Sequence, residues 1–486
     1  EHAYIKGVNK LKNLTINSSE VAYTQIGEGC ELVNGIIGYG CRIFYGVKAV
    51  RFVLSSFSQL KYGARLINSF LGDNSTISCC EVLNSLLFPA HEQHHNNSFL
   101  CASLIKGQSN MAAGATVGSN HNSRAADGEI IAGRGFWPGL CVSLKHNSKF
   151  ASYTLIVKGD FLHELDIRIP FSLVSNDTVK DQLVLLPGYW FMYNMYALMR
   201  NTSKFTARDK RQFKNQYIEY DVLAPDTVNE IFTGLAEIEI AVGHATLAQD
   251  AAHTKGHTAS LRHAGKVLLE APEKLNKQPV LMQGVECSKR QVVLAKPQEA
   301  YHLFKRMIRY HGALALVGYL KDHSMTELLH YIADNKAISR EAFENIGGQL
   351  VPVVQVEALL ASVKDGSIST WDEMHTQYHQ WSDRYLTDKF NHALAALAEV
   401  TETALASWDK NFIQQLLQES LSTRAWICEE SFNSRSKDYE NPFKLMVYES
   451  MEEMEEVVGS LSDNAFINSE RKAFEQYKAA VEPLLQ

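Results

Sequence analysis

Residues 36–66 read IIGYGCRIFYGVKAVRFVLSSFSQLKYGARL, and aliphatic side chains recur in them at six-residue steps. Val47 and Val53 are one step apart, and Leu54, Leu60 and Leu66 keep the same step. Neither an amphipathic helix nor an alternating strand repeats at six. A β-helix with three short sides per coil does, because each hexapeptide forms one side and points one aliphatic side chain inward. Small residues at the corners fit its tight turns.

The six-residue rhythm continues to about residue 165, with shifts of frame between runs. We interpret these shifts as inserted loops, and Pro89–Ser98 and Asn122–Gly128 are the two candidates. Repetition at a fixed period is typical of a solenoid, in which equivalent residues stack on successive turns. The further runs in step are Leu71, Ile77 and Leu83; Phe99, Ile105, Met111 and Val117; Ile130, Phe136 and Val142; and Leu144, Phe150, Ile156 and Leu162.

The rhythm resembles the hexapeptide-repeat, left-handed parallel β-helix superfamily, to which many trimeric acyltransferases belong. Two phrases carry the resemblance, namely Ile37-Gly38-Tyr39-Gly40-Cys41-Arg42 and Val117-Gly118-Ser119-Asn120. It covers roughly residues 30–165. The resemblance implies left-handed winding and a homotrimer with clefts between the chains. The whole chain also resembles an uncharacterised bacterial family in which a β-helix precedes a helical region, on the phrases GRGFWPG at 133–139 and YWFMYNMY at 189–196.

Beyond Pro170 the rhythm ends and the chain is predicted to be mainly helical. Pro225 is well placed to begin a helix. Residues 298–320 form another predicted helix, and Thr370 with Glu373 makes a capping box that opens a third, to about residue 400. We therefore predict an α+β multidomain protein: a left-handed parallel β-helix at 1–170, an aromatic and basic helical connector at 171–245, and an α-helical domain at 246–486.

The composition narrows the classes of function. The chain has 486 residues, 45% hydrophobic and 21% charged, with a net charge of −7. That charge gives no overall basic field for nucleic acid or anionic lipid. No apolar run has the length of a membrane span, and no secretory signal is recognisable, so we expect a cytoplasmic protein. The eight cysteines follow no zinc-finger spacing.

Three similar phrases mark the candidate site: His94-His95-Asn96-Asn97-Ser98, His121-Asn122-Ser123 and His146-Asn147-Ser148. His95 and His121 are 26 residues apart, and His121 and His146 are 25 apart. Equal spacing in a solenoid predicts that these histidines lie on one face. The alternative interpretation is that Asn and Ser cap turns and the histidines are solvated.

A neutral imidazole can take a proton from a hydroxyl or amine nucleophile. The resemblance implies one such histidine in an intersubunit cleft, and His121 matches best because it follows the phrase 117–120. His95 and His146 complete the predicted catalytic set. Substrate contacts are predicted at Asn120, Asn122, Arg124, Asp127, Glu129 and Arg134.

The same histidines permit a metal site, because three imidazoles plus water form a catalytic zinc centre. His95, His121 and His146 are the candidate ligands, as in a hydratase or lyase similar to γ-type carbonic anhydrases. The paired histidines of that family are not reproduced here. A second histidine group, His244, His253, His257 and His263, has ligand-compatible spacing but is more simply a polar helix face.

The leading hypothesis is acyl transfer to a sugar or nucleotide-sugar acceptor, with His121 as the general base and acyl-CoA as the co-substrate. We expect no nucleic-acid or membrane partner. The alternatives are the zinc-dependent hydratase or lyase, a protein like the sugar-nucleotide pyrophosphorylases, and a non-enzymatic trimeric scaffold. Fold alone does not choose among them.

Overall fold

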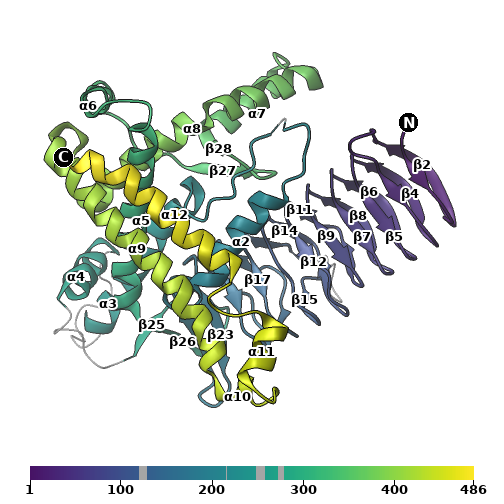
Figure 1. The fold of residues 1–486 in the computed structure, drawn as a ribbon, viewed down its shortest axis with the longest axis horizontal. Coiled ribbons are helices and arrows are strands. Elements are labelled where there is room, and N and C mark those ends of the chain that lie inside the picture. The colour runs from purple at the N-terminus through teal and green to yellow at the C-terminus, as the bar shows by residue number, and fades with distance from the viewer. Residues whose placement is uncertain (120–127, 215, 248–257, 272–278) are drawn as a thin grey trace.

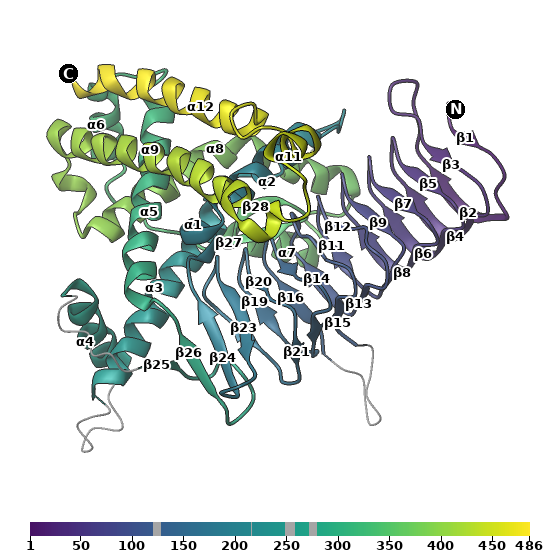
Figure 2. The same ribbon diagram turned by 60° about the horizontal axis from the view of Figure 1, so that its bottom comes forward.

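The computed structural model describes residues 1–119, 128–214, 216–247, 258–271 and 279–486. A parallel β-solenoid comes first and a mainly helical region follows it, as predicted (Figure 1). The helices gather at the C-terminal end of the solenoid, and the N-terminal coils extend away from them (Figure 2). The left-handed winding and the trimer stay predictions.

One side of the solenoid is a six-stranded parallel sheet. Its register joins Ile26 to Ile43, Ile43 to Leu60 and Leu60 to Ile77, which is a step of 17 residues. All four side chains are fully buried. They form an aliphatic column inside the prism. The strands are β1 (Tyr4–Ile5), β3 (Gln25–Ile26), β5 (Arg42–Phe44), β7 (Gln59–Lys61), β9 (Thr76–Ser78) and β12 (Glu92–Gln93).

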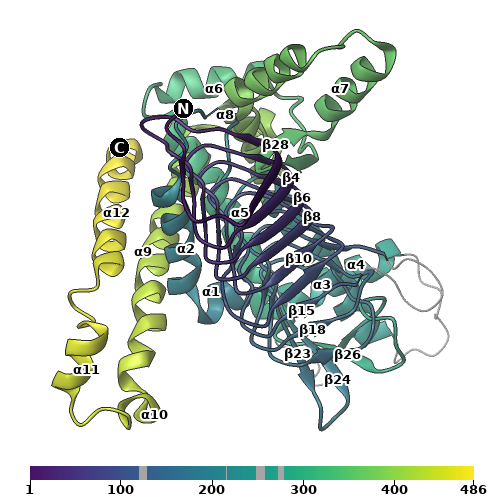
Figure 3. The ribbon, with the colours of Figure 1, turned by 90° about the vertical axis from the view of Figure 1, so that its right-hand side faces the viewer.

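The other two sides belong to one 14-stranded sheet, whose stacked strands are seen from the N-terminal end in Figure 3. In the early coils one strand covers both sides and bends at a residue with positive φ, such as Asn34 or Asn68. These strands are β2 (Lys10–Ile16), β4 (Glu31–Ile37), β6 (Lys48–Leu54) and β8 (Arg65–Leu71). The later second-side strands are β10 (Glu81–Leu83), β13 (Phe99–Cys101), β15 (Thr116–Val117), β18 (Ser143–Leu144) and β21 (Asp160–Phe161), and the third-side strands are β11 (Leu86–Leu87), β14 (Ser103–Ile105), β16 (Ile130–Ala132), β19 (Lys149–Phe150) and β22 (Asp166–Ile167).

The coil is one residue shorter than three hexapeptides. Leu54, Leu60 and Leu66 are buried on three successive sides, so the six-residue step holds there. The next buried aliphatic position is Leu71, only five residues on. The shifts of frame therefore come from a five-residue side in the coil. The expectation of an inserted loop at 89–98 is wrong, because β12 lies inside that segment and pairs with β9.

An insertion does lie further along. β15 pairs with β18 through Thr116 and Ser143, and β14 pairs with β16 through Leu104 and Ile131. Both steps are 27 residues, ten more than the regular coil. The extra residues fall between Val117 and Ile130, where the sequence predicted a loop at 122–128. Residues 120–127 are outside the described part of the chain.

The last coils merge with strands from the helical region. β23 pairs with β20 in parallel and with β24 in antiparallel fashion, and β24 pairs with β26. β25 and β26 pair with each other in antiparallel fashion. This third sheet contains β17 (Trp137–Pro138), β20 (Leu155–Ile156), β23 (Leu173–Asp177), β24 (Gln182–Leu186), β26 (Gln291–Leu294) and β25 (Val280–Met282), and a separate hairpin contains β27 (Phe343–Ile346) and β28 (Gln349–Pro352).

The helices follow the predicted starts closely. One begins at Pro225, another at Pro297, and Thr370 and Glu373 form the expected capping box. No helix in the described ranges is apolar over the length needed to cross a membrane. The helices are α1 (Tyr189–Tyr193), α2 (Met195–Arg208), α3 (Pro225–Leu247), α4 (Thr258–Glu270), α5 (Pro297–Tyr319), α6 (Met325–Asp334), α7 (Val353–Asp365), α8 (Trp371–Thr401), α9 (Lys410–Glu440), α10 (Pro442–Leu445), α11 (Met451–Val458) and α12 (Ala465–Val481).

One hydrophobic core runs from the solenoid into the helical region. Trp190 of α1 is buried against the last coils, and its indole nitrogen donates to the carbonyl oxygen of Tyr153 at 2.7 Å. Phe191 packs on Phe171, with 4.6 Å between ring centroids. The aromatic segment therefore attaches the helices to the prism, and the two regions form one body.

Candidate ligand cavity

The solenoid does not bring its described candidate histidines together. His95 lies in the turn between β12 and β13, whereas His146 lies in the turn between β18 and β19. These turns are different corners of the coil, since β13 and β18 occupy the second side and β19 the third. The prediction of a common face is wrong for this pair within one chain. His121 lies outside the described residues.

The spacing of His95 and His146 gave a wrong prediction because an insertion lies between them. His95 and His146 are 51 residues apart, which equals three regular coils. The ten extra residues between β15 and β16 break that register. The two residues are consequently displaced from one corner to another.

The Asn-Ser part of the phrase serves the turn itself. Asn97 and Asn147 have φ of 59° and 56°, a left-handed conformation that asparagine tolerates better than most residues. The Ser98 hydroxyl donates to the carbonyl oxygen of His95 at 3.2 Å, and the Ser148 hydroxyl donates to that of Lys145 at 2.8 Å. The alternative interpretation, turn chemistry, accounts for these two phrases.

Two of the predicted substrate contacts lie in the described part of the chain, and their exposure to solvent differs. Glu129 is exposed just before β16. Arg134 is 1% exposed and points into the junction with the helical region. These surroundings favour a structural role for Arg134 over the predicted contact with a substrate. Asn120, Asn122, Arg124 and Asp127 lie outside the described residues.

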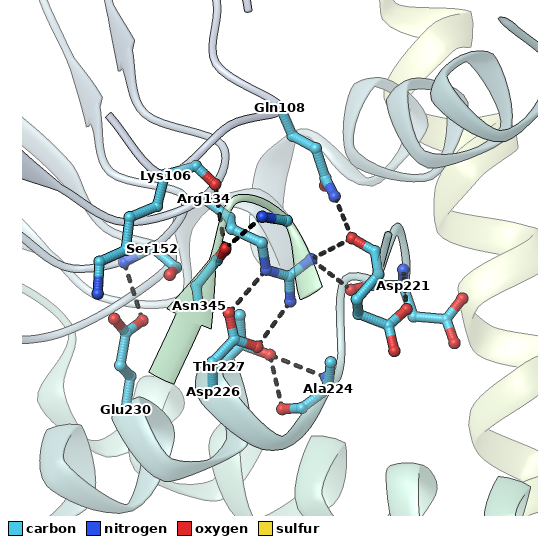
Figure 4. A network of polar contacts seen from close by, with 12 residues as sticks. Lys106, Gln108, Arg134, Ser152, Asp221, Ala224, Asp226, Thr227, Glu230 and Asn345 are labelled. Carbon is cyan, nitrogen blue, oxygen red and sulfur yellow. Dashed lines mark hydrogen bonds and ion pairs between the residues drawn. The ribbon is translucent and has the colours of Figure 1, made fainter. Parts of the chain in front are cut away.

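Arg134 joins the solenoid to the helices (Figure 4). Its guanidinium donates to both carboxylate oxygens of Asp226, at 2.7 and 2.8 Å, and to the carbonyl oxygens of Asp221 at 2.9 Å and Glu219 at 3.4 Å. Gln108, from the neighbouring coil, donates to the same Glu219 carbonyl at 2.6 Å. Burial would lower the pKa of Arg134, but Asp226 outweighs it and raises that pKa. Two coils thus fix the backbone of residues 219–221.

A cavity of about 690 Å³ opens beside this fixed segment. Its size lies within the range of small-molecule sites, and most of its wall is apolar. The wall comes from α1, α2, α5, α6, α8, α9 and the segment 217–223. The apolar and aromatic lining residues are Phe191, Met195, Met199, Val222, Leu223, Met307, Tyr310, Leu314, Ala315, Tyr319, Tyr331, Leu386, Phe390 and Ile427.

A buried ion-pair network forms one polar part of the cavity wall. The Lys389 ammonium lies 2.8 Å from a Glu219 carboxylate oxygen and 2.6 Å from one of Asp221. The Tyr385 hydroxyl donates to Glu219 as well. Burial would lower the pKa of Lys389, yet the two carboxylates outweigh it and raise that pKa. Asp221 keeps 64% of its side chain exposed, so its carboxylate is accessible from the cavity.

His311 supplies the second polar group. Its side chain lines the cavity and is only 3% exposed. Burial lowers the pKa of His311 to about 3, so the imidazole is neutral at physiological pH. The ring hydrogen-bonds to the backbone of Leu223, and Nε2 has no hydrogen-bond partner among the residues that the structure describes. A neutral ring that donates through one nitrogen can accept through the other.

A second buried histidine stands behind the first. The His392 ring lies 6.4 Å from that of His311, and its Nε2 is 3.0 Å from the side-chain oxygen of Asn229. Burial, with the nearby His311 next in importance, lowers the pKa of His392 to about 2. The His392 ring packs edge-on against Phe343, with 5.5 Å between the ring centroids.

Within the described residues, no group of three His, Cys, Asp or Glu side chains is arranged to hold a metal ion. The predicted zinc ligands His95 and His146 are on different corners, so they do not meet in one chain. Of the second group, His244 is on α3 and His263 on α4, while His253 and His257 lie outside the described residues. Among the described residues, no two of the predicted zinc ligands lie together.

Two family models and one protein are similar to parts of this chain. Residues 1–240 match the family model named domain of unknown function DUF4954, and residues 324–486 match that of domain of unknown function DUF6819. An uncharacterized protein of Treponema pallidum (strain Nichols) is 45% identical over 467 residues, or 96% of this chain. The chain spans 63% of that protein's length.

The solved structures give no functional lead. The structure of UDP-N-acetylglucosamine acyltransferase from Arabidopsis is matched over 55% of this chain and 93% of that one, at 9% identity. The TM-score is 0.17. At this value the likeness carries no argument about activity, and the site is best read from its own residues.

Sequence reasoning missed the cavity, although one signal was available. Tyr385, Lys389 and His392 follow the i, i+4, i+7 pattern of one helix face. The same face continues through Ala396, which is fully buried. When polar side chains share a helix face with buried apolar residues, those polar side chains are expected to be enclosed by the fold as well. The predicted helix from Thr370 to about residue 400 contained this pattern.

Proposed function

We propose that this protein binds an amphipathic small molecule in the cavity between α2, α5 and α8. The single observation that carries the proposal is the pairing of an apolar cavity of about 690 Å³ with the unpartnered Nε2 of buried His311. A buried acceptor without a partner is costly, and a ligand that donates a hydrogen bond relieves that cost. The apolar wall takes the rest of the molecule.

The charges near the cavity indicate the chemistry of the polar head of this ligand. Lys389 is already neutralised by Glu219 and Asp221, so it has little to offer an anion. Arg134 is matched by Asp226. The five groups together carry one net negative charge, and the accessible part of it is the Asp221 carboxylate. A hydroxyl or amine head is therefore favoured over a carboxylate head.

The test compares three probes with one tail: dodecylamine, dodecanol and dodecanoic acid, each below its micellar concentration. Calorimetric titration of the full chain should give tighter binding for the amine and the alcohol than for the acid. Asp221→Asn should weaken the amine about fivefold or more, because a direct charge-assisted contact is lost. The same change should leave the alcohol nearly unaffected.

Steric blocking gives an independent test. Leu314 lines the cavity and is 38% exposed, so a larger side chain fits there without disrupting the core. Leu314→Trp should weaken every probe at least about tenfold by filling the space. Leu360→Trp is the matched control, because Leu360 is 63% exposed on α7 and does not line the cavity. Equal binding by wild type and Leu314→Trp would refute the proposal.

Acyl transfer at the solenoid stays a second proposal. The parallel β-solenoid is the fold on which that chemistry was expected, with His121 as base, acyl-CoA as donor and a sugar or nucleotide-sugar as acceptor in a homotrimer. His95 and His146 stand at separate corners of the chain, so we expect only His121→Ala to abolish turnover. Thioester consumption by the three alanine variants and the mass of the assembly in solution decide it. A monomer with unchanged turnover in His121→Ala would exclude this mechanism.

A further inference from the structure

A second hollow, of about 410 Å³, also lies along α5, and Tyr310 lines both this hollow and the ligand cavity. It is a groove between α5 and α9. Three cationic side chains from α5 line it, namely Lys305, Arg306 and Arg309. From α9 come the hydroxyl-bearing Ser422 and Thr423 and the carboxylate of Glu419. We call this hollow the α5–α9 groove.

Arg306 lies in the groove without an ion-pair partner in the described chain. Its Nε donates to the Thr423 hydroxyl at 3.0 Å, and one terminal nitrogen donates to the Ser422 carbonyl oxygen at 3.3 Å. The guanidinium stacks over Trp426, with 4.4 Å from Cζ to the ring centroid. Burial lowers the pKa of Arg306, and no carboxylate offsets this effect. The side chain is held in place while its charge is uncompensated.

The neighbouring cations are only partly matched. Arg309 lies 3.4 Å from a Glu419 carboxylate oxygen through one terminal nitrogen, and its buried Nε has no hydrogen-bond partner in the described ranges. Lys305 lies 3.1 Å from Glu270, which is outside the groove lining. Three cations thus face two carboxylates. One positive charge remains, and it is concentrated on Arg306.

We propose that the α5–α9 groove binds the phosphoryl group of a small anionic molecule. Guanidinium forks match the oxygens of phosphate in pairs, and a phosphoryl group has enough acceptor oxygens for Arg306 and Arg309 together. The groove volume leaves room for the group that carries the phosphate. Stacking on Trp426 fixes the fork before the anion arrives, so little side-chain entropy is lost on binding.

The experiment titrates the full chain with inorganic phosphate in a calorimeter, at constant ionic strength maintained with chloride. Wild type should bind phosphate, and Arg306→Gln should weaken the affinity about tenfold, because one charge-assisted contact and the uncompensated charge are lost. Glu419→Gln should act in the opposite direction and tighten binding about threefold, since it frees Arg309 and removes a repelling carboxylate. Opposite effects of two neighbouring substitutions are not produced by a general loss of folding.

Arg384→Gln is the matched control, because Arg384 is 64% exposed on α8 and pairs with Asp388 within its own helix. It should leave phosphate affinity unchanged. The proposal is overturned if wild type gives no phosphate heat above that of chloride, or if Glu419→Gln weakens binding. Equal effects of Arg306→Gln and Arg384→Gln would also overturn it, since binding would then depend on net charge alone. The dodecyl probes report on the other cavity, so the two proposals fail independently.

Discussion

His95, at a corner of the solenoid, and His311 and His392, in the helical region, occupy opposite environments. His95 is exposed in a turn whose hydrogen bonds are made by Ser98 and the backbone. His311 and His392 are 3% and 2% exposed and neutral, and each has a ring nitrogen without a partner. The phrase that repeats in the sequence marks backbone geometry, whereas the isolated histidines carry the polar chemistry of the interior.

The physical reason is that a solenoid imposes the same demand on every coil. A tight corner needs a residue that tolerates positive φ, so asparagine recurs at Asn13, Asn34, Asn68, Asn84, Asn97 and Asn147. A ligand cavity has no such periodicity, because each wall comes from a different helix. A repeated sequence motif is therefore evidence for the fold. A buried polar group without a partner is better evidence for a binding site.

The largest effect is expected where the two regions meet. Arg134→Met removes a guanidinium that is 1% exposed and leaves the carboxylate of Asp226, 14% exposed, without its partner. Breaking a buried pair in this way should cost about 3–5 kcal/mol. Urea unfolding followed by circular dichroism measures it. Arg168→Met is the control, because Arg168 is 36% exposed and its pair with Glu237 should contribute no more than about 1 kcal/mol. Equal losses would show that Arg134 does not hold the junction.

The next effect depends on pH. Burial, then Asp226, raises the pKa of Glu230 from 4.5 to about 7, against a hydrogen bond from the Ser152 amide at 2.9 Å. The folded state then holds the proton more tightly than the unfolded one. The contribution of protonated Glu230 to the free energy of unfolding is complete below pH 4.5, and it is lost as the pH rises through about 7.

Glu230→Gln keeps the acceptor for Ser152 and has no proton to lose. At pH 8 its free energy of unfolding should exceed that of wild type by up to about 3 kcal/mol, and the difference should vanish near pH 4. Chemical unfolding across this range gives the curve. Glu129→Gln removes one negative charge at an exposed position and serves as the matched control. A constant offset for Glu230→Gln would mean that its carboxyl does not titrate in this window.

The sequence predicted the solenoid well because inward positions are set locally. Leu54, Leu60 and Leu66 are one step apart on adjacent sides, and each must be apolar for its own coil to close. The five-residue side was harder to see, since Leu66 and Leu71 appeared as a break between runs. The helix starts at Pro225 and Thr370 were likewise local signals, of a fixed φ and of a capping box.

The cavity could not be predicted in the same way. Met199, His311 and Lys389 are on three helices far apart in the sequence, and only tertiary packing brings them to one wall. Arg134 was predicted as a substrate contact, whereas its partner in the structure is Asp226, 92 residues away. No periodic pattern encodes such a pair. The sequence could identify the residue, and the structure alone identifies the carboxylate that it binds.

A smaller effect tests the corner chemistry. Asn147 has φ of 56°, so Asn147→Ala should cost about 1 kcal/mol, because a Cβ without a polar partner is disfavoured in this region. Asn147→Gly should restore most of that loss, since glycine adopts positive φ freely. Thermal unfolding of the three proteins compares them. If glycine proves as costly as alanine, the asparagine side chain has a role beyond the turn.

The smallest effect is expected at His95, and it bears most directly on the comparison. The ring is exposed, and the turn uses the backbone carbonyl of His95 and the hydroxyl of Ser98, neither of which His95→Ala removes. The free energy of unfolding should change by no more than about 0.5 kcal/mol. Acyl-CoA consumption should be unchanged in the same variant if His121 is the base of the solenoid reaction. A loss of turnover with full stability would instead return His95 to the catalytic set and require a second chain to complete its site, because His146 stands at another corner.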